Sequence, residues 1–160
     1  MKFRCWALAS AILFAASAQA QSQAMVSAKN PAGLVTLLQG AGYEPKLGAD
    51  SYGDPQIEID IADYKTTILF YGCDETTHKN CDSVQLRAGF DRKAPWTAAE
   101  ALAVAKKYRF ASVWLDETGD PWVQWDILTG DGIPAPLFLA AVETFGDTLS
   151  DTAEMVFEDE

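Results

Sequence analysis

DSYGDPQIEIDI (residues 50–61) and DETGDPWVQWDI (residues 116–127) share the pattern D-x-x-G-D-P-x-apolar-x-apolar-D-I at an offset of 66 residues. In each stretch a turn sequence precedes residues that alternate in direction, which is typical of a β-strand with one face on a core. The repeat therefore predicts two β-hairpins of the same design. It describes architecture and indicates no reaction.

The spacing D-x-x-G predicts a type I turn whose glycine adopts the left-handed conformation of a G1 bulge. Such a turn fixes the register, because the residue before the first aspartate then lies opposite the proline. In the first hairpin, Lys46 faces Glu58 on the side turned away from the core, as an oppositely charged pair. In the second, Trp114 faces Trp122 on the corresponding side, which also carries Gln124.

Two interpretations of the tryptophan pair remain open. Large aromatic side chains usually mark burial, so a helix or a loop could cover Trp114 and Trp122. Alternatively, the pair forms an exposed platform, since apolar patches on an acidic surface mark interaction sites. The candidate partner-binding surface is accordingly Trp114, Trp122 and Gln124, with Lys46 and Glu58 as its polar counterpart.

Helix and strand patterns extend on both sides of the hairpins. Asn30-Pro31 starts a helix that ends at Gly42, the capping box Thr97 to Glu100 starts a second that fades near residue 108, and a third runs from 134 or 136 to 149. The order is α-β-β-β-β-α-β-β-α, so the sequence predicts an α+β fold, a mostly antiparallel sheet with helices packed on it. The six expected strands cover residues 43–49, 56–61, 66–73, 81–90, 111–116 and 122–128.

The N-terminus reads as a Sec-type signal peptide. Lys2 and Arg4 precede an apolar run at 6–16, and alanines 18 and 20 suit a signal peptidase. Because the only nearby cysteine, Cys5, precedes the apolar run, a lipoprotein is not expected. The competing interpretation is a buried core helix. We expect residues 1–20 to be cleaved, 21–29 to be a flexible segment, 30–150 to form one domain and 151–160 to be an acidic tail, in a periplasmic or secreted protein.

The chain is strongly acidic, with 23 Asp and Glu against 12 Lys and Arg. Loss of residues 1–20 removes two cations and no acid, which takes the formal net charge from −11 to −13. Such a protein is repelled by nucleic acid and by anionic membranes, so neither is an expected partner. A cationic partner is favoured, although acidity also serves solubility.

Cys73 and Cys81 flank a polar loop between two predicted strands. An even pair of cysteines in an exported protein predicts a disulfide bond across the mouth of that hairpin. The alternative uses His78, which lies between them, as a third metal ligand, but a structural zinc site normally has four ligands.

No reaction can be assigned. The single histidine, His78, lies in a polar loop and no phosphate-binding glycine loop is present, so we expect no catalytic residues, no cofactor and no metal site. A calcium site is an alternative, because Asp50 and Asp54, and likewise Asp116 and Asp120, bracket tight turns. Neither turn has the alternating ligands of an EF-hand, and aspartate is ordinary at such positions.

Three stretches together resemble a known family: FYGCDETTHKNCDSVQLRAGFD (70–91), WTAAEALAVAKKYRFA (96–111) and LDETGDPWVQWDI (115–127). They are similar to exported members of the YbjN domain family, which is described as a bacterial sensory transduction regulator. The likeness covers about residues 30–148, and its most specific parts are 71–83 and 116–121. The family is similar in fold to type III secretion chaperones, which commonly dimerise and bind polypeptides. The resemblance thus implies a non-enzymatic module with a protein partner, and a homodimer as one arrangement.

The leading hypothesis is a periplasmic protein-binding, chaperone-like or regulatory module of the YbjN type. One alternative is a small-ligand binder, for example of carbohydrate, that stacks its ligand on Trp114 and Trp122. Another is an inhibitor of a cationic enzyme such as lysozyme, which rests on the net charge alone.

Overall fold

The computed structural model describes residues 24–158, so the expected signal peptide at 1–20 lies outside the described residues. A six-stranded sheet in the order β2-β3-β4-β5-β7-β6 forms the centre of the fold, and all of its strand pairs are antiparallel. The strands are β2 (Lys46–Ala49), β3 (Pro55–Ile61), β4 (Tyr64–Tyr71), β5 (Ser83–Gly89), β6 (Ser112–Leu115) and β7 (Pro121–Leu128).

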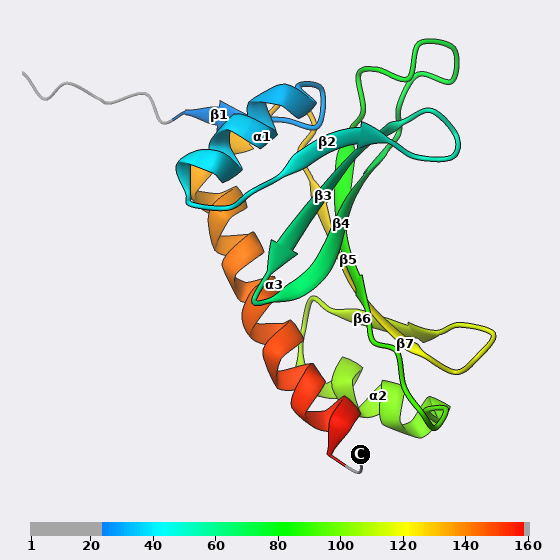
Figure 1. The fold of residues 1–160 in the computed structure, drawn as a ribbon. Helices are drawn as coiled ribbons and strands as arrows, with labels where there is room; N and C mark the ends of the chain where they lie inside the picture. The colour runs from blue at the N-terminus through cyan, green and yellow to red at the C-terminus, as the bar shows by residue number, and fades with distance from the viewer. Residues whose placement is uncertain (1–23, 159–160) are drawn as a thin grey trace, which may run out of the picture.

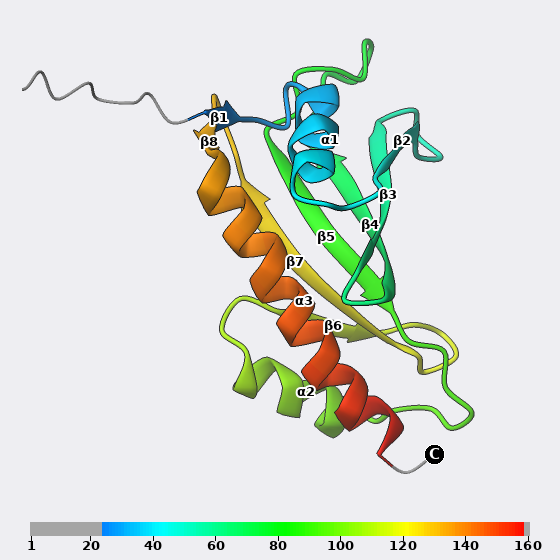
Figure 2. The same cartoon turned by 60° about the vertical axis from the view of Figure 1, so that its left-hand side comes forward.

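Three helices accompany the sheet: α1 (Pro31–Gly40), α2 (Ala98–Lys107) and α3 (Ala135–Phe157). Figures 1 and 2 show α1 and α3 against one face of the sheet, with α2 beside the C-terminal part of α3. Within residues 24–158 no helix covers the other face. None of these helices is long and apolar enough to cross a membrane.

The core lies between the helices and the inner face of the sheet. Alternation along β3 turns Ile57, Ile59 and Ile61 inward, where they are almost fully buried against the helices. Phe138 and Phe145 of α3 have no exposed surface. Each such side chain contributes about 2 to 3 kcal/mol of burial free energy, which fixes which face of the sheet the helices cover.

The predicted fold class and element order are confirmed, and so is the register of both hairpins. Lys46 pairs with Glu58 and Trp114 pairs with Trp122. Each turn closes as expected, with the first aspartate's N–H donating to the second aspartate's carbonyl at 2.8 and 3.0 Å. Gly53 and Gly119 have φ of +94° and +85°, the left-handed conformation that the G1 bulge requires.

The termini of the domain are more ordered than the sequence suggested. Within the segment expected to be flexible, β1 (Met25–Val26) pairs with β8 (Ile133–Pro134), and Ala28 is fully buried. At the other end, α3 continues through Phe157, so residues 151–157 are not a tail. The apolar residues of this last stretch explain the difference, because Ala153 and Val156 extend the buried stripe of the helix.

The first strand of the sheet begins at residue 46 rather than 43. The N–H of Tyr43 donates to the carbonyl of Leu38, and the N–H of Gly42 to that of Gln39, which ties this segment to the end of α1. The chain therefore joins β3 only at Lys46. The similarity to secretion chaperones that the family resemblance implied stays a prediction.

Candidate functional site: the outer face of the sheet

The outer face is the set of sheet residues that point away from α1 and α3. Strand alternation places three cations and three carboxylates on it: Lys46, Lys65 and Arg87, and Glu58, Asp60 and Asp126. The outer face thus carries no net formal charge, although the whole chain carries −11. The excess acidity lies on the helices and loops.

Two stacked tryptophans occupy one corner of the outer face. The rings of Trp114 on β6 and Trp122 on β7 are nearly parallel, with 5.7 Å between centroids and 12° between planes. Trp114 keeps 39% of its surface exposed, whereas Trp122 is half-buried. The exposed alternative thus describes Trp114, and the covered alternative describes Trp122 in part.

Two residues of the neighbouring strand β5, Gly89 and Arg87, contact the ring of Trp122. A Cβ on Gly89 would come within 2.8 Å of its ring, so glycine at this cross-strand position leaves the space that the indole fills. The guanidinium carbon of Arg87 lies 5.0 Å from the ring centroid, a cation–π contact. Within the described residues Arg87 has no ion-pair partner. Sequence reasoning missed both residues, because their role depends on β5 lying beside β7.

The second D-x-x-G-D-P turn anchors the indole from its edge. Trp122 donates its Nε1–H to Asp116 Oδ2 over 3.2 Å. The Thr118 hydroxyl, the Asp120 N–H and this indole all donate to the Asp116 carboxylate and lower its pKa to about 2. The carboxylate therefore stays ionised at neutral pH and keeps its hydrogen bonds to the turn and to the tryptophan.

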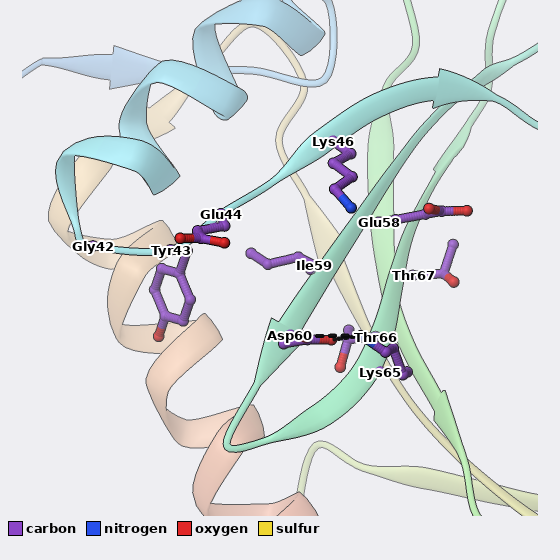
Figure 3. Close-up of a pocket in the computed structure, with 10 residues that line it drawn as sticks. All are labelled: Gly42, Tyr43, Glu44, Lys46, Glu58, Ile59, Asp60, Lys65, Thr66 and Thr67. Carbon is purple, nitrogen blue, oxygen red and sulfur yellow. Dashed lines mark hydrogen bonds and ion pairs between the residues drawn. The ribbon is translucent and has the colours of Figure 1, made fainter.

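Lys46 and Glu58 do not adjoin the tryptophans, because β4 and β5 lie between β3 and β7. Instead they line a groove of about 570 Å³ where the chain before β2 diverges from β3. Figure 3 shows the groove between Tyr43 and Glu44 on one side and Asp60 and Lys65 on the other. Of the predicted surface residues, the structure brings together Trp114, Trp122 and Gln124 only.

The predicted disulfide joins Cys73 and Cys81. It closes a loop that docks on the first hairpin, where His78 Nδ1 lies 2.9 Å from Asp54 Oδ1. The second hairpin uses the equivalent residue in the same way, because Asp120 Oδ1 accepts the N–H of Arg92 at 2.9 Å. The second aspartate of each repeat, Asp54 or Asp120, thus binds a neighbouring loop. From the sequence, these aspartates were expected to serve turn geometry alone.

The described residues contain no group of three or more His, Cys, Asp or Glu side chains placed to hold a metal ion. The aspartates weighed as calcium ligands bond to their own turns. Asp50 Oδ1, for example, accepts the N–H groups of Tyr52 and Asp54 at 2.8 and 3.0 Å. The outer face offers aromatic surface and balanced charge, which suit contact with another molecule.

A family model matches most of the chain. The YbjN model, described as "Putative bacterial sensory transduction regulator", matches residues 30–158. That range contains all three helices and the whole six-stranded sheet. No curated protein matches the chain.

Proposed function

This chain belongs to the YbjN family, and from that premise we propose that it is a periplasmic module that binds a protein partner through its outer face. The proposal assigns no catalysis. It makes Trp114 and Trp122 the centre of the contact, with Arg87 and Gln124 beside them on neighbouring strands.

The stacked tryptophans carry this proposal. Tryptophan and arginine are enriched where binding energy concentrates in interfaces, and here they meet on a face that none of the helices α1 to α3 covers. The zero net charge of the outer face adds support, because neither an acidic nor a basic partner meets a net repulsion there.

The periplasmic location rests on two features of the chain. Its first 20 residues have the pattern of a signal peptide, and its two remaining cysteines form a disulfide, which persists in oxidising compartments. Cell fractionation, with mass spectrometry of the N-terminus, tests the location. A protein that stays in the cytoplasm with Met1 in place would contradict it.

Site-specific photo-crosslinking in living cells tests the binding face. A photoreactive residue in place of Gln124 on β7 is expected to trap a discrete partner. The same residue in place of Glu143, an exposed position on α3, serves as the matched control and is expected to trap none. A Trp114→Ala/Trp122→Ala variant should lose the crosslink at position 124 while it keeps its far-ultraviolet circular dichroism.

Two results would contradict the proposed function. Equal crosslinking from positions 124 and 143 would mean that the outer face is not the contact surface. Undiminished crosslinking in the double alanine variant would mean that the tryptophans do not contribute. The first result tests which face binds the partner, and the second tests which residues of that face contribute.

A second candidate is a carbohydrate-binding protein, which the exposed indole of Trp114 favours, since sugar rings stack on aromatic faces. Titration with oligosaccharides, followed by tryptophan fluorescence, distinguishes it: saturation that resists high salt would favour the sugar. An inhibitor of a cationic enzyme gains no support from the outer face, because that face has no negative excess to attract a cation.

A further inference from the structure

The sheet has two edge strands, β2 and β6, which are equivalent in the repeated hairpin design. Leu47 corresponds to Val113 and Gly48 to Trp114 at the offset of 66 residues. Edge strands expose unpaired N–H and C=O groups that can pair with another chain, so natural proteins usually protect them. The two copies differ in this protection.

The β6 edge presents main-chain groups without partners. Asp116 donates its N–H to Asp120 across the hairpin, so the alternate residues Trp114 and Ser112 bond to β7. The N–H and C=O groups of Val113 and Leu115 therefore point away from β7. Within the described residues no chain pairs with them, and all four residues of β6 keep some exposed surface.

The β2 edge carries the usual protection. Its sequence is Lys-Leu-Gly-Ala, and Pro45 precedes it. A lysine, a proline and a glycine all disfavour pairing with a further strand. The β6 sequence is Ser-Val-Trp-Leu, with no charge, proline or glycine. The β6 edge is as short as the β2 edge and has α2 beside it, but it lacks the residues that disfavour a further strand on β2.

Trp114 offers a side-chain contact at the same edge. One face of its ring stacks on Trp122, and in the described part of the chain no strand lies beyond β6 to supply a neighbour for the other face. The two ends of the edge also differ in charge, with Arg109 before β6 and Asp116 and Glu117 after it. The edge therefore distinguishes the two directions of an added strand.

We infer that β6 is a strand-addition site that takes an extended segment of a partner protein, antiparallel to β6, which is the more stable pairing. The segment has an apolar residue beside Trp114, a basic residue toward Asp116 and Glu117, and an acidic residue toward Arg109. Val113 and Leu115 bind its main chain. This inference rests on the proposed function, since it states how the partner of the outer face is held.

A matched pair of proline variants tests the main-chain contact. Val113→Pro removes one outward N–H and leaves the ladder to β7 intact, because proline is tolerated on an edge strand when its nitrogen faces outward. Leu47→Pro makes the same change on β2 and is the control. The probe is a peptide of sequence Lys-Val-Ile-Val-Glu, blocked at both ends. It contains no tryptophan.

Binding is followed by the fluorescence of the protein's tryptophans. We expect saturable binding that Val113→Pro weakens about five- to tenfold, the effect of one lost main-chain hydrogen bond and an unpaired carbonyl. Leu47→Pro should leave the affinity unchanged, and a peptide with lysine and glutamate exchanged should bind more weakly. A peptide N-methylated at the residue beside Val113 repeats the test on the unaltered protein, should Val113→Pro fold poorly.

Three results would overturn strand addition. They are no saturable binding of the probe, equal weakening by both proline variants, and equal affinity for the N-methylated peptide. If sedimentation shows that the wild-type chain self-associates and Val113→Pro abolishes this, the occupant is a second copy of the chain. Crosslinking at position 124 that is lost in the tryptophan variant but kept in Val113→Pro would overturn the inference and leave the proposed function intact.

Discussion

Replacing Gly89 by alanine should push the Trp122 ring out of its stacked position on Trp114. The new Cβ would lie 2.8 to 2.9 Å from three atoms of the Trp122 indole. Ordinary carbon contacts need about 3.6 Å, so the ring must move by about 0.8 Å. Since the indole Nε1 is already 3.2 Å from Asp116, this shift is enough to break that hydrogen bond. Overpacking of this kind typically costs about 1 to 3 kcal/mol.

Urea denaturation and near-ultraviolet circular dichroism measure the two consequences, stability and fixed aromatic packing. Gly48→Ala is the matched control, because nothing lies within 4 Å of a Cβ there and a methyl on an outer strand stabilises by up to about 1 kcal/mol relative to glycine. Gly89→Ala should lose stability and alter the aromatic signal, and Gly48→Ala should do neither. If the two variants had the same stability and the same aromatic signal, the close contact between Gly89 and the Trp122 ring would not determine the packing of that ring.

Three further changes have expected outcomes. Cys73→Ser/Cys81→Ser should lower the free energy of unfolding by about 2.5 kcal/mol, measured in urea, and reductant should then have no further effect. The pKa of Asp116 falls to about 2 on folding, so its stabilisation is complete above the unfolded value of about 4 and is lost as pH falls toward 2. The melting temperature of Asp116→Asn should therefore approach that of the wild type between pH 4 and 2, and a constant difference would contradict this. His78→Ala should speed amide exchange in the 74–80 loop, because the contact with Asp54 is lost, and should change global stability by less than about 1 kcal/mol; unaltered exchange would mean the loop is held by its disulfide alone.

Local chemistry made the hairpins predictable. The glycine of each D-x-x-G fixes a bulge, and the bulge fixes which residues face each other, so the Lys46–Glu58 and Trp114–Trp122 pairs followed from sequence. Helix starts were equally local, since Asn30 and the Thr97 capping box act on N–H groups within one turn.

What depends on distant strands could not be predicted in this way. The order β5-β7-β6 places Gly89 and Arg87 of β5 beside Trp122 of β7. Nothing in the sequence of β5 indicates that β7 will be its neighbour. The exposure of Trp114 likewise depends on β6 being an edge. Ala153 and Val156 carried the apolar signal that extends α3, but the acidic residues around them suggested a tail.

The separation of charge between the two sides of the sheet makes the molecule an electric dipole. The outer face is neutral, whereas α3 on the other side carries four carboxylates, Glu143, Asp147, Asp151 and Glu154, and no cation. An approaching polyanion is therefore repelled more strongly from the helix side, which turns the outer face toward it. An acidic partner would then meet the outer face first, before any short-range contact forms. This orientation should weaken as salt shortens the Debye length to about 8 Å at physiological ionic strength, so it governs the encounter rate rather than the final affinity.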